Sequence, residues 1–198
     1  FHVVRAGTRA AVQVAPAERQ GQPVWTIHNG VSEFVVAPGF GPSVVAWNLD
    51  GDNQLFSYFP KPEGFSFVYP WFGGIHALLM PADRMFWEGM LDRDVAEAEP
   101  LQATDASGLV WQGVRLRTRP STPAVRDFQV ELDFTTLGES RLLRFVYRLR
   151  NLQAAEQPVR MGCNVAGRLG ARPEDLLLRG EGITRHPTPW AAFFQHKT

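Results

Sequence analysis

Residues 125–135 read VRDFQVELDFT, and this stretch decides the fold class. Apolar and polar residues alternate from Phe128 to Thr135, which is the pattern of a strand that buries one face. Residues 141–151, RLLRFVYRLRN, alternate in the same way. Because a short connection containing Gly138 separates the two stretches, we predict a β-hairpin.

Charged residues gather on the polar face of this hairpin. A register that keeps both apolar faces on one side places Asp133 near Arg144. The preceding stretch, 109–119, also alternates, and its arginines are expected beside Glu131 and Asp133 as cross-strand charge pairs. A basic binding face is the alternative, but we favour a solvated face of paired charges.

Short strands also precede this region. They are predicted at 24–29, 31–37 and 43–49. The Asn29-Gly30 pair between the first two is a strong signal for a tight hairpin. Residues 94–103 have some helical character, but Pro100 interrupts them, so we predict a loop. The sequence therefore indicates an all-β chain, a two-layer antiparallel β-sandwich that forms a single domain over residues 1–198.

Composition excludes several classes of partner. The 198 residues are 44% hydrophobic, and 20 Lys and Arg balance 20 Asp and Glu. A chain without net charge has no net field to attract nucleic acid or an anionic membrane, so we expect neither as a partner. No apolar run is long enough for a membrane span, and the first ten residues lack the apolar stretch of a signal peptide.

The single cysteine, Cys163, excludes an internal disulfide and a cysteine-rich metal site. A reducing compartment is the default for such a chain, so we expect a cytoplasmic protein. The histidines show no zinc-ligand spacing, and no phosphate-binding Gly-rich loop is present, so we predict neither a metal nor a cofactor. The first residue is Phe1 rather than Met, which leaves open a longer chain with an adjoining domain.

Residues 65–79, FSFVYPWFGGIHALL, are a candidate ligand site. Two consecutive glycines are unfavourable in a packed strand, so we expect something to approach the backbone at Gly73 and Gly74. Aromatic faces beside an open backbone and the imidazole of His76 suit a sugar, whose C–H face stacks on a ring. The alternative is a core strand that ends in a turn, with His76 as a structural histidine.

Three motifs, in this order, resemble the galactose mutarotase and aldose 1-epimerase superfamily. Residues 35–51 resemble its opening hairpin, with a Pro-Gly turn between two strands. Residues 69–74, YPWFGG, resemble the signature of its hexose-phosphate epimerase branch. Residues 144–151 with the following Pro158 resemble the strand that precedes its catalytic histidine. The resemblance covers residues 24 to about 170 and implies a large mutarotase-like β-sandwich, incomplete at its C-terminus here, that binds sugars.

The resemblance also implies catalytic residues, and this chain departs from them. Such enzymes use a histidine as general acid and a glutamate as general base. Asn164 stands at the approximate position of one expected histidine, and Glu88 near the position of the second. His76 substitutes only if its loop folds differently. The base is expected beyond Thr198, so it is not assigned.

From these residues we predict a sugar site with Glu88 and His76 as the candidate catalytic groups. The predicted substrate-binding residues are Trp71, Gly73, Gly74, Arg84, Trp87 and Asn164. The two tryptophans are the expected stacking platforms, although core packing explains each of them equally well.

The leading hypothesis is a domain that binds a mono- or oligosaccharide and lacks the standard epimerase acid and base. An active aldose or hexose-phosphate 1-epimerase, an isomerase whose base lies downstream, is the first alternative. A structural or interaction domain that binds no sugar is the second.

Overall fold

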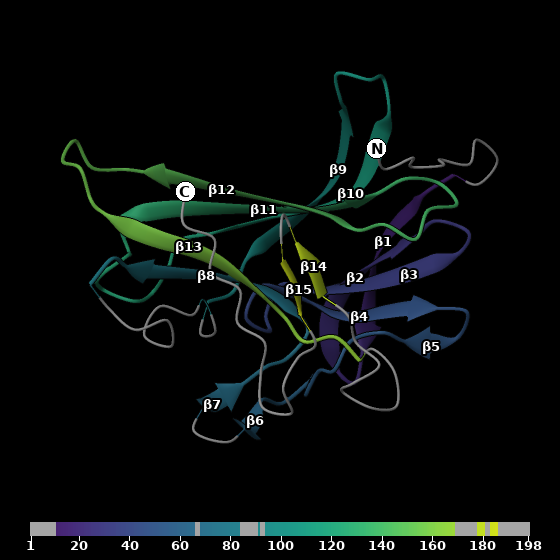
Figure 1. Ribbon diagram of the computed structural model, residues 1–198, viewed down its shortest axis with the longest axis horizontal. Coiled ribbons are helices and arrows are strands. Elements are labelled where there is room, and N and C mark those ends of the chain that lie inside the picture. Colours follow the sequence, from purple (N-terminus) through teal and green to yellow (C-terminus); the bar gives the residue numbers. More distant parts are fainter. Residues whose placement is uncertain are drawn as a thin grey trace.

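A computed structural model describes residues 11–65, 68–83, 91, 94–168, 178–180 and 183–185. These residues form 15 strands in antiparallel sheets (Figure 1). The largest sheet has the order β1-β2-β3-β4-β8-β13, with β5 paired to β4. Its strands are β1 (Gln13–Arg19), β2 (Gln22–His28), β3 (Ser32–Ala37), β4 (Ser43–Leu49), β5 (Asp52–Asn53), β8 (Ile75–Pro81) and β13 (Val159–Val165).

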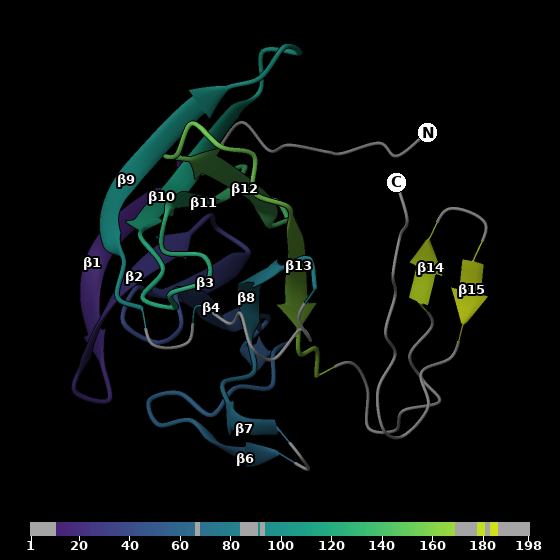
Figure 2. The same cartoon turned by 90° about the vertical axis from the view of Figure 1, so that its left-hand side faces the viewer.

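A four-stranded sheet with the order β12-β11-β10-β9 packs over the first. Its strands are β9 (Glu97–Thr104), β10 (Val110–Thr118), β11 (Phe128–Thr136) and β12 (Arg144–Asn151). Two small hairpins complete the described elements: β6 (Glu63–Phe65) with β7 (Val68–Trp71), and β14 (Leu178–Gly180) with β15 (Ile183–Arg185). The pair β6 and β7 stands apart from the two main sheets (Figure 2).

The core lies between the two main sheets and consists of alternate residues from both. Phe34, Leu79, Leu116 and Phe134 are among its fully buried side chains. The alternation that predicted a half-buried strand at residues 125–135 is therefore correct, and the predicted all-β sandwich is confirmed.

A second apolar cluster covers the other face of the large sheet, which we call the outer face. It includes Val35, Phe40 and Phe72, with Phe59 packed against it. Phe40 contacts Phe72 and Phe59 edge-on, with ring centroids 4.6 and 5.3 Å apart. The segments between β3 and β4 and between β5 and β8 thus supply aromatic side chains to the outer face.

The exposed face of the four-stranded sheet carries the predicted charge pairs. Arg115 lies opposite Asp133, and Arg117 lies opposite Glu131. The guanidinium of Arg115 donates two hydrogen bonds to Asp133, of 2.7 and 2.9 Å, and Arg148 donates a third of 2.6 Å. Burial raises the pKa of Asp133, but these hydrogen bonds outweigh burial and hold the pKa below its usual value.

The predicted proximity of Asp133 to Arg144 is wrong. Asp133 lies opposite Val146, and Arg144 lies opposite Thr135. The hairpin connection extends to residue 143, three residues further than the sequence suggested, and this shifts the pairing by two residues. Because side chains in a strand alternate with a period of two, a shift of two residues leaves the same side chains on the exposed face of the sheet.

The predicted loop at 94–103 is also wrong, because β9 occupies most of it. Pro100 lies opposite Val114 in a strand that pairs with β10 on one side only. Proline is tolerated in such an edge strand because its missing N–H is not needed there.

Asn29 is more than a turn residue. It follows β2, as the hairpin signal predicted, but its side chain is fully buried. Its amide group donates to Thr136, Leu137 and Ser140 over 2.6–3.0 Å. Its carbonyl oxygen accepts from the Ser32 N–H at 2.9 Å. Asn29 therefore ties the β2–β3 turn of one sheet to the β11–β12 connection of the other.

Candidate functional site

The paired glycines lie where the chain crosses itself. Gly73 and Gly74 are buried and have positive φ angles of 68° and 72°. A Cβ atom on Gly73 would overlap with the carbonyl oxygen of Phe56, and one on Gly74 with that of Val44. The expectation that something approaches this backbone is correct, and what approaches is the chain's own main chain.

Hydrogen bonds hold this crossing together. The Gly74 N–H donates to the Phe56 carbonyl at 2.7 Å, and the Gly74 carbonyl accepts from the Ala166 N–H at 2.8 Å. The Phe56 N–H donates to the Ala166 carbonyl at 2.9 Å, which closes the set. Packing of the chain on itself therefore accounts for both glycines, and their role in substrate binding stays a prediction.

Three polar residues lie side by side on the outer face of the large sheet. His76 on β8 is opposite Asn164 on β13 and opposite Ser43 on β4. Directly opposite residues in antiparallel strands have Cβ atoms about 5 Å apart. The sequence placed His76 and Asn164 in one site, and the fold does bring them together.

Burial determines the protonation state of His76. The residue is only 4% exposed, and its Nδ1 lies 3.3 Å from the Gly73 carbonyl, which can only accept. Desolvation lowers the pKa of His76 to about 4, and the hydrogen bond to Gly73 opposes this shift. His76 is therefore neutral near pH 7 and holds no imidazolium proton to donate.

The hydroxyl of Ser43 is not arranged as a nucleophile activated by His76. Its side chain is fully buried, and its hydroxyl donates to the Phe40 carbonyl at 2.6 Å. Asn164 is half-buried and has no ionisable group. The three residues can position neighbouring groups and donate or accept hydrogen bonds, but they do not supply the acid and base that an epimerase needs.

Next to Ser43 and Phe40, the outer face is hollowed. The hollow has a volume of about 310 Å³, at the small end of the range of about 300–1,000 Å³ that is typical of ligand sites. Its described lining consists of Gln22, Pro23, Ala37, Gly39, Phe40, Phe59, Pro60, Pro62 and Phe72. Three phenylalanines and three prolines thus line the hollow together with Gln22, and backbone and side-chain polar atoms share the lining with the apolar ones.

This hollow was not predicted from the sequence. The segment 38–42, PGFGP, and the segment 59–62, FPKP, were available as signals, since both place aromatic rings beside prolines. We interpreted the first only as a turn. The two segments are about 20 residues apart in the sequence, and the fold brings them together at the end of β3.

The remaining predicted site residues are placed only in part. The backbone of Trp71 ends β7, opposite Glu63 of β6, one residue before Phe72 of the hollow. Arg84, Trp87 and Glu88 lie outside the described residues. Their roles as catalytic or binding groups remain predictions.

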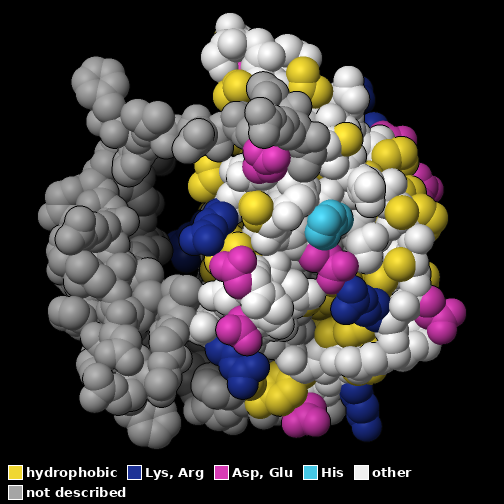
Figure 3. Space-filling view, turned by 90° about the vertical axis from the view of Figure 1, so that its right-hand side faces the viewer, with side chains coloured by type: hydrophobic (Ala, Val, Ile, Leu, Met, Phe, Trp, Pro, Cys, Tyr) yellow, Lys and Arg dark blue, Asp and Glu magenta, His cyan; other side chains and the backbone are white. Residues whose placement is uncertain are grey.

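Neither positive nor negative charge predominates on the face drawn in Figure 3. Basic and acidic side chains are interspersed there with small, separate hydrophobic areas. In the described part of the chain, no group of three or more His, Cys, Asp and Glu side chains is arranged to hold a metal ion. Nor do the described residues contain a helix with the length and apolarity to cross a membrane.

Comparison of the chain with models of protein families, with curated proteins and with solved structures found no match.

Proposed function

We propose that this protein binds a saccharide in the hollow on the outer face of the large sheet and does not act as an epimerase. The observation that carries the proposal is the lining of the hollow by Phe40, Phe59 and Phe72. The resemblance to the mutarotase-like superfamily supports it, because it points to the same segment of sequence, around YPWFGG.

The chemistry of the hollow suits one sugar ring. The ring of the half-buried Phe59 provides a surface for the C–H face of a pyranose, whereas Phe40 and Phe72 are only 5% and 7% exposed, and Phe40 packs against Phe59. The amide of Gln22 offers both a donor and an acceptor to a hydroxyl. A volume of about 310 Å³ favours a monosaccharide or the end residue of an oligosaccharide over a longer internal segment.

The state of His76 argues for binding rather than catalysis. A general acid works best when its pKa lies near the working pH. The pKa of His76 is lowered to about 4, and burial leaves 4% of the residue exposed. We assign His76 and Asn164 to the support of the site rather than to proton transfer.

Isothermal titration with a panel of monosaccharides, including glucose and galactose, tests the proposal. We expect saturable heat for at least one sugar, and Phe59→Ala should remove it. Phe56→Ala is the matched control, because Phe56 is an exposed phenylalanine nearby that does not line the hollow. The absence of heat with every sugar, or equal loss in both variants, contradicts the proposal.

Polarimetry on fresh α-glucose and α-galactose separates binding from epimerisation. We expect the approach to anomeric equilibrium to proceed at the rate of buffer alone. A rate that rises in proportion to protein concentration supports an epimerase and refutes the assignment of His76.

A further inference from the structure

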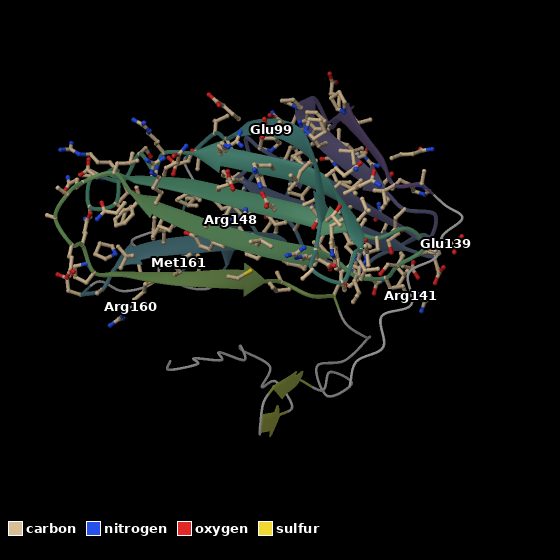
Figure 4. The ribbon with its side chains drawn as sticks, turned by 90° about the horizontal axis from the view of Figure 1, so that it is seen from above. Glu99, Glu139, Arg141, Arg148, Arg160 and Met161 are labelled. Carbon is tan, nitrogen blue, oxygen red and sulfur yellow. The ribbon has the colours of Figure 1, made fainter. Side chains whose placement is uncertain are left out.

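The two main sheets differ in width on one side of the sandwich. β12 ends the four-stranded sheet and β13 ends the large sheet, and in the described residues each pairs with a single neighbour. The two strands run along the same side of the molecule (Figure 4). The hydroxyl of Tyr147 on β12 donates to the Leu78 carbonyl on β8 at 3.4 Å. β12, the last strand of the four-stranded sheet, therefore lies over β8, and β13 extends beyond the edge of that sheet.

As a result, the other described residues leave the core-facing side of β13 uncovered. Met161, Cys163 and Val165 lie opposite Leu79, Ala77 and Ile75, respectively, which are buried in the core between the sheets. Side chains at opposite positions point to the same face, so these three belong to the core side. Met161 is nevertheless 47% exposed and Val165 59%, and Cys163 is also exposed. We call these three residues the uncovered row.

The edge of β12 above the uncovered row is basic. Its outward side chains at alternate positions are Arg144, Val146, Arg148 and Arg150, and the three arginines are exposed. Arg148 is paired with Glu131 and Asp133. Arg144 stacks on Trp111, 5.1 Å from the ring centroid, and has no carboxylate among the described residues within ion-pair distance; the same holds for Arg150.

These two features select one kind of occupant. A strand added to the free edge of β12 would point alternate side chains down onto the uncovered row and the others outward beside the arginines. The downward side chains must be apolar to cover Met161 and Val165. The outward ones must be acidic to pair with Arg144 and Arg150. β12 contains no proline, unlike the opposite edge strand β9, so its free edge is complete for main-chain pairing.

We propose that β12 accepts an extended segment of another protein, with alternating apolar and acidic residues, as a fifth strand of the small sheet. A second copy of this chain is a poorer occupant. Pairing of β12 with another β12 sets one row of arginines against an identical row, and like charges directly opposite each other are destabilising. Repulsion between the arginines thus disfavours pairing of β12 with a second β12, whereas an acidic strand can still pair with this edge.

A synthetic peptide, acetyl-(Glu-Val)4-amide, tests this by titration of the ¹⁵N-labelled full chain, followed by amide shifts in NMR. We expect saturable shifts at β12 and at the uncovered row of β13. The peptide with N-methyl groups on alternate residues should bind at least tenfold more weakly, because it lacks the N–H groups of one edge. The peptide (Lys-Val)4 should also bind at least tenfold more weakly.

Variants of the protein sharpen the test. Arg144→Glu/Arg150→Glu should weaken the acidic peptide at least fivefold and strengthen (Lys-Val)4. Val165→Asp, at an exposed position that should not impair folding, should weaken the acidic peptide at least threefold. Arg119→Glu is the matched control and should change neither affinity appreciably, because Arg119 is an exposed arginine that follows β10 rather than β12.

Any of three peptide results overturns the proposal: no shifts at millimolar peptide, equal binding of the N-methylated peptide, or equal binding of peptides with opposite charge. Self-association of the full chain through β12 in sedimentation also overturns it, in favour of a second copy.

Discussion

Replacing Gly74 by alanine tests the crossing of the chain at the paired glycines. The positive φ of 72° costs an L-residue about 1–2 kcal/mol. The new Cβ also overlaps with the Val44 carbonyl, and overpacking of this kind costs about 1–3 kcal/mol. We therefore expect Gly74→Ala to lower the free energy of unfolding by about 3 kcal/mol. For a chain of 198 residues this corresponds to a fall in Tm of roughly 6–12 °C.

Three other glycines separate the two contributions. Gly51 has a positive φ of 90° and open space, so Gly51→Ala measures the backbone cost alone. Gly113→Ala measures the overlap alone, since its Cβ meets the Phe134 carbonyl and it has no positive φ. Gly39→Ala has neither cost and should be neutral or slightly stabilising.

The measurement is chemical unfolding in guanidinium chloride, followed by tryptophan fluorescence, for the four variants in parallel. We expect Gly74→Ala to lose about as much stability as the Gly51 and Gly113 variants lose together. If Gly74→Ala is as stable as Gly39→Ala, the backbone crossing is not the reason for the glycine, and an approaching ligand again becomes the better explanation.

Further predictions concern individual side chains. Because desolvation lowers the pKa of His76 to about 4, its ring should titrate near pH 4 in NMR. The free energy of unfolding should fall as the pH drops from about 6.5 toward 4, by about 3 kcal/mol in all. An NMR titration midpoint near pH 6.5 contradicts this prediction. Asp133→Asn should cost about 3 kcal/mol in urea unfolding, since it leaves Arg115 and Arg148 without their shared carboxylate, whereas Glu99→Gln at the exposed end of the same network should cost under about 1 kcal/mol. Asn29→Ala should cost at least about 3 kcal/mol by the same assay, because buried partners in both sheets lose their hydrogen bonds, and a loss below about 1 kcal/mol contradicts the role of Asn29 in joining the two sheets.

Strand alternation made most of the sandwich predictable. β4 occupies the predicted residues 43–49, and the strands around the NG turn and the 125–151 hairpin are within a few residues of the prediction. Alternation identifies the buried face of each strand regardless of its partner, so it also placed the β10 residues Arg115 and Arg117 beside Asp133 and Glu131. It did not predict that Arg148, rather than Arg144, contacts Asp133. These features depend only on local sequence.

Features that depend on distant contacts were not predictable. The register of β12 follows from the length of its connection, and β9 forms despite Pro100 because its partner β10 lies on one side only. The hollow needs Phe40 and Phe59 to meet, and nothing in either segment indicates the other. The uncovered row on β13 arises from the unequal width of two sheets, which no single strand encodes.

The most direct test of the saccharide site is ¹H–¹⁵N NMR of the labelled chain during titration with the monosaccharide that gives the largest heat. The account predicts saturable shifts at Gly39, Phe40, Phe59 and Phe72, around the hollow, and none along β11. Unchanged spectra at sugar concentrations of tens of millimolar, or shifts confined to residues away from the hollow, contradict the proposed function.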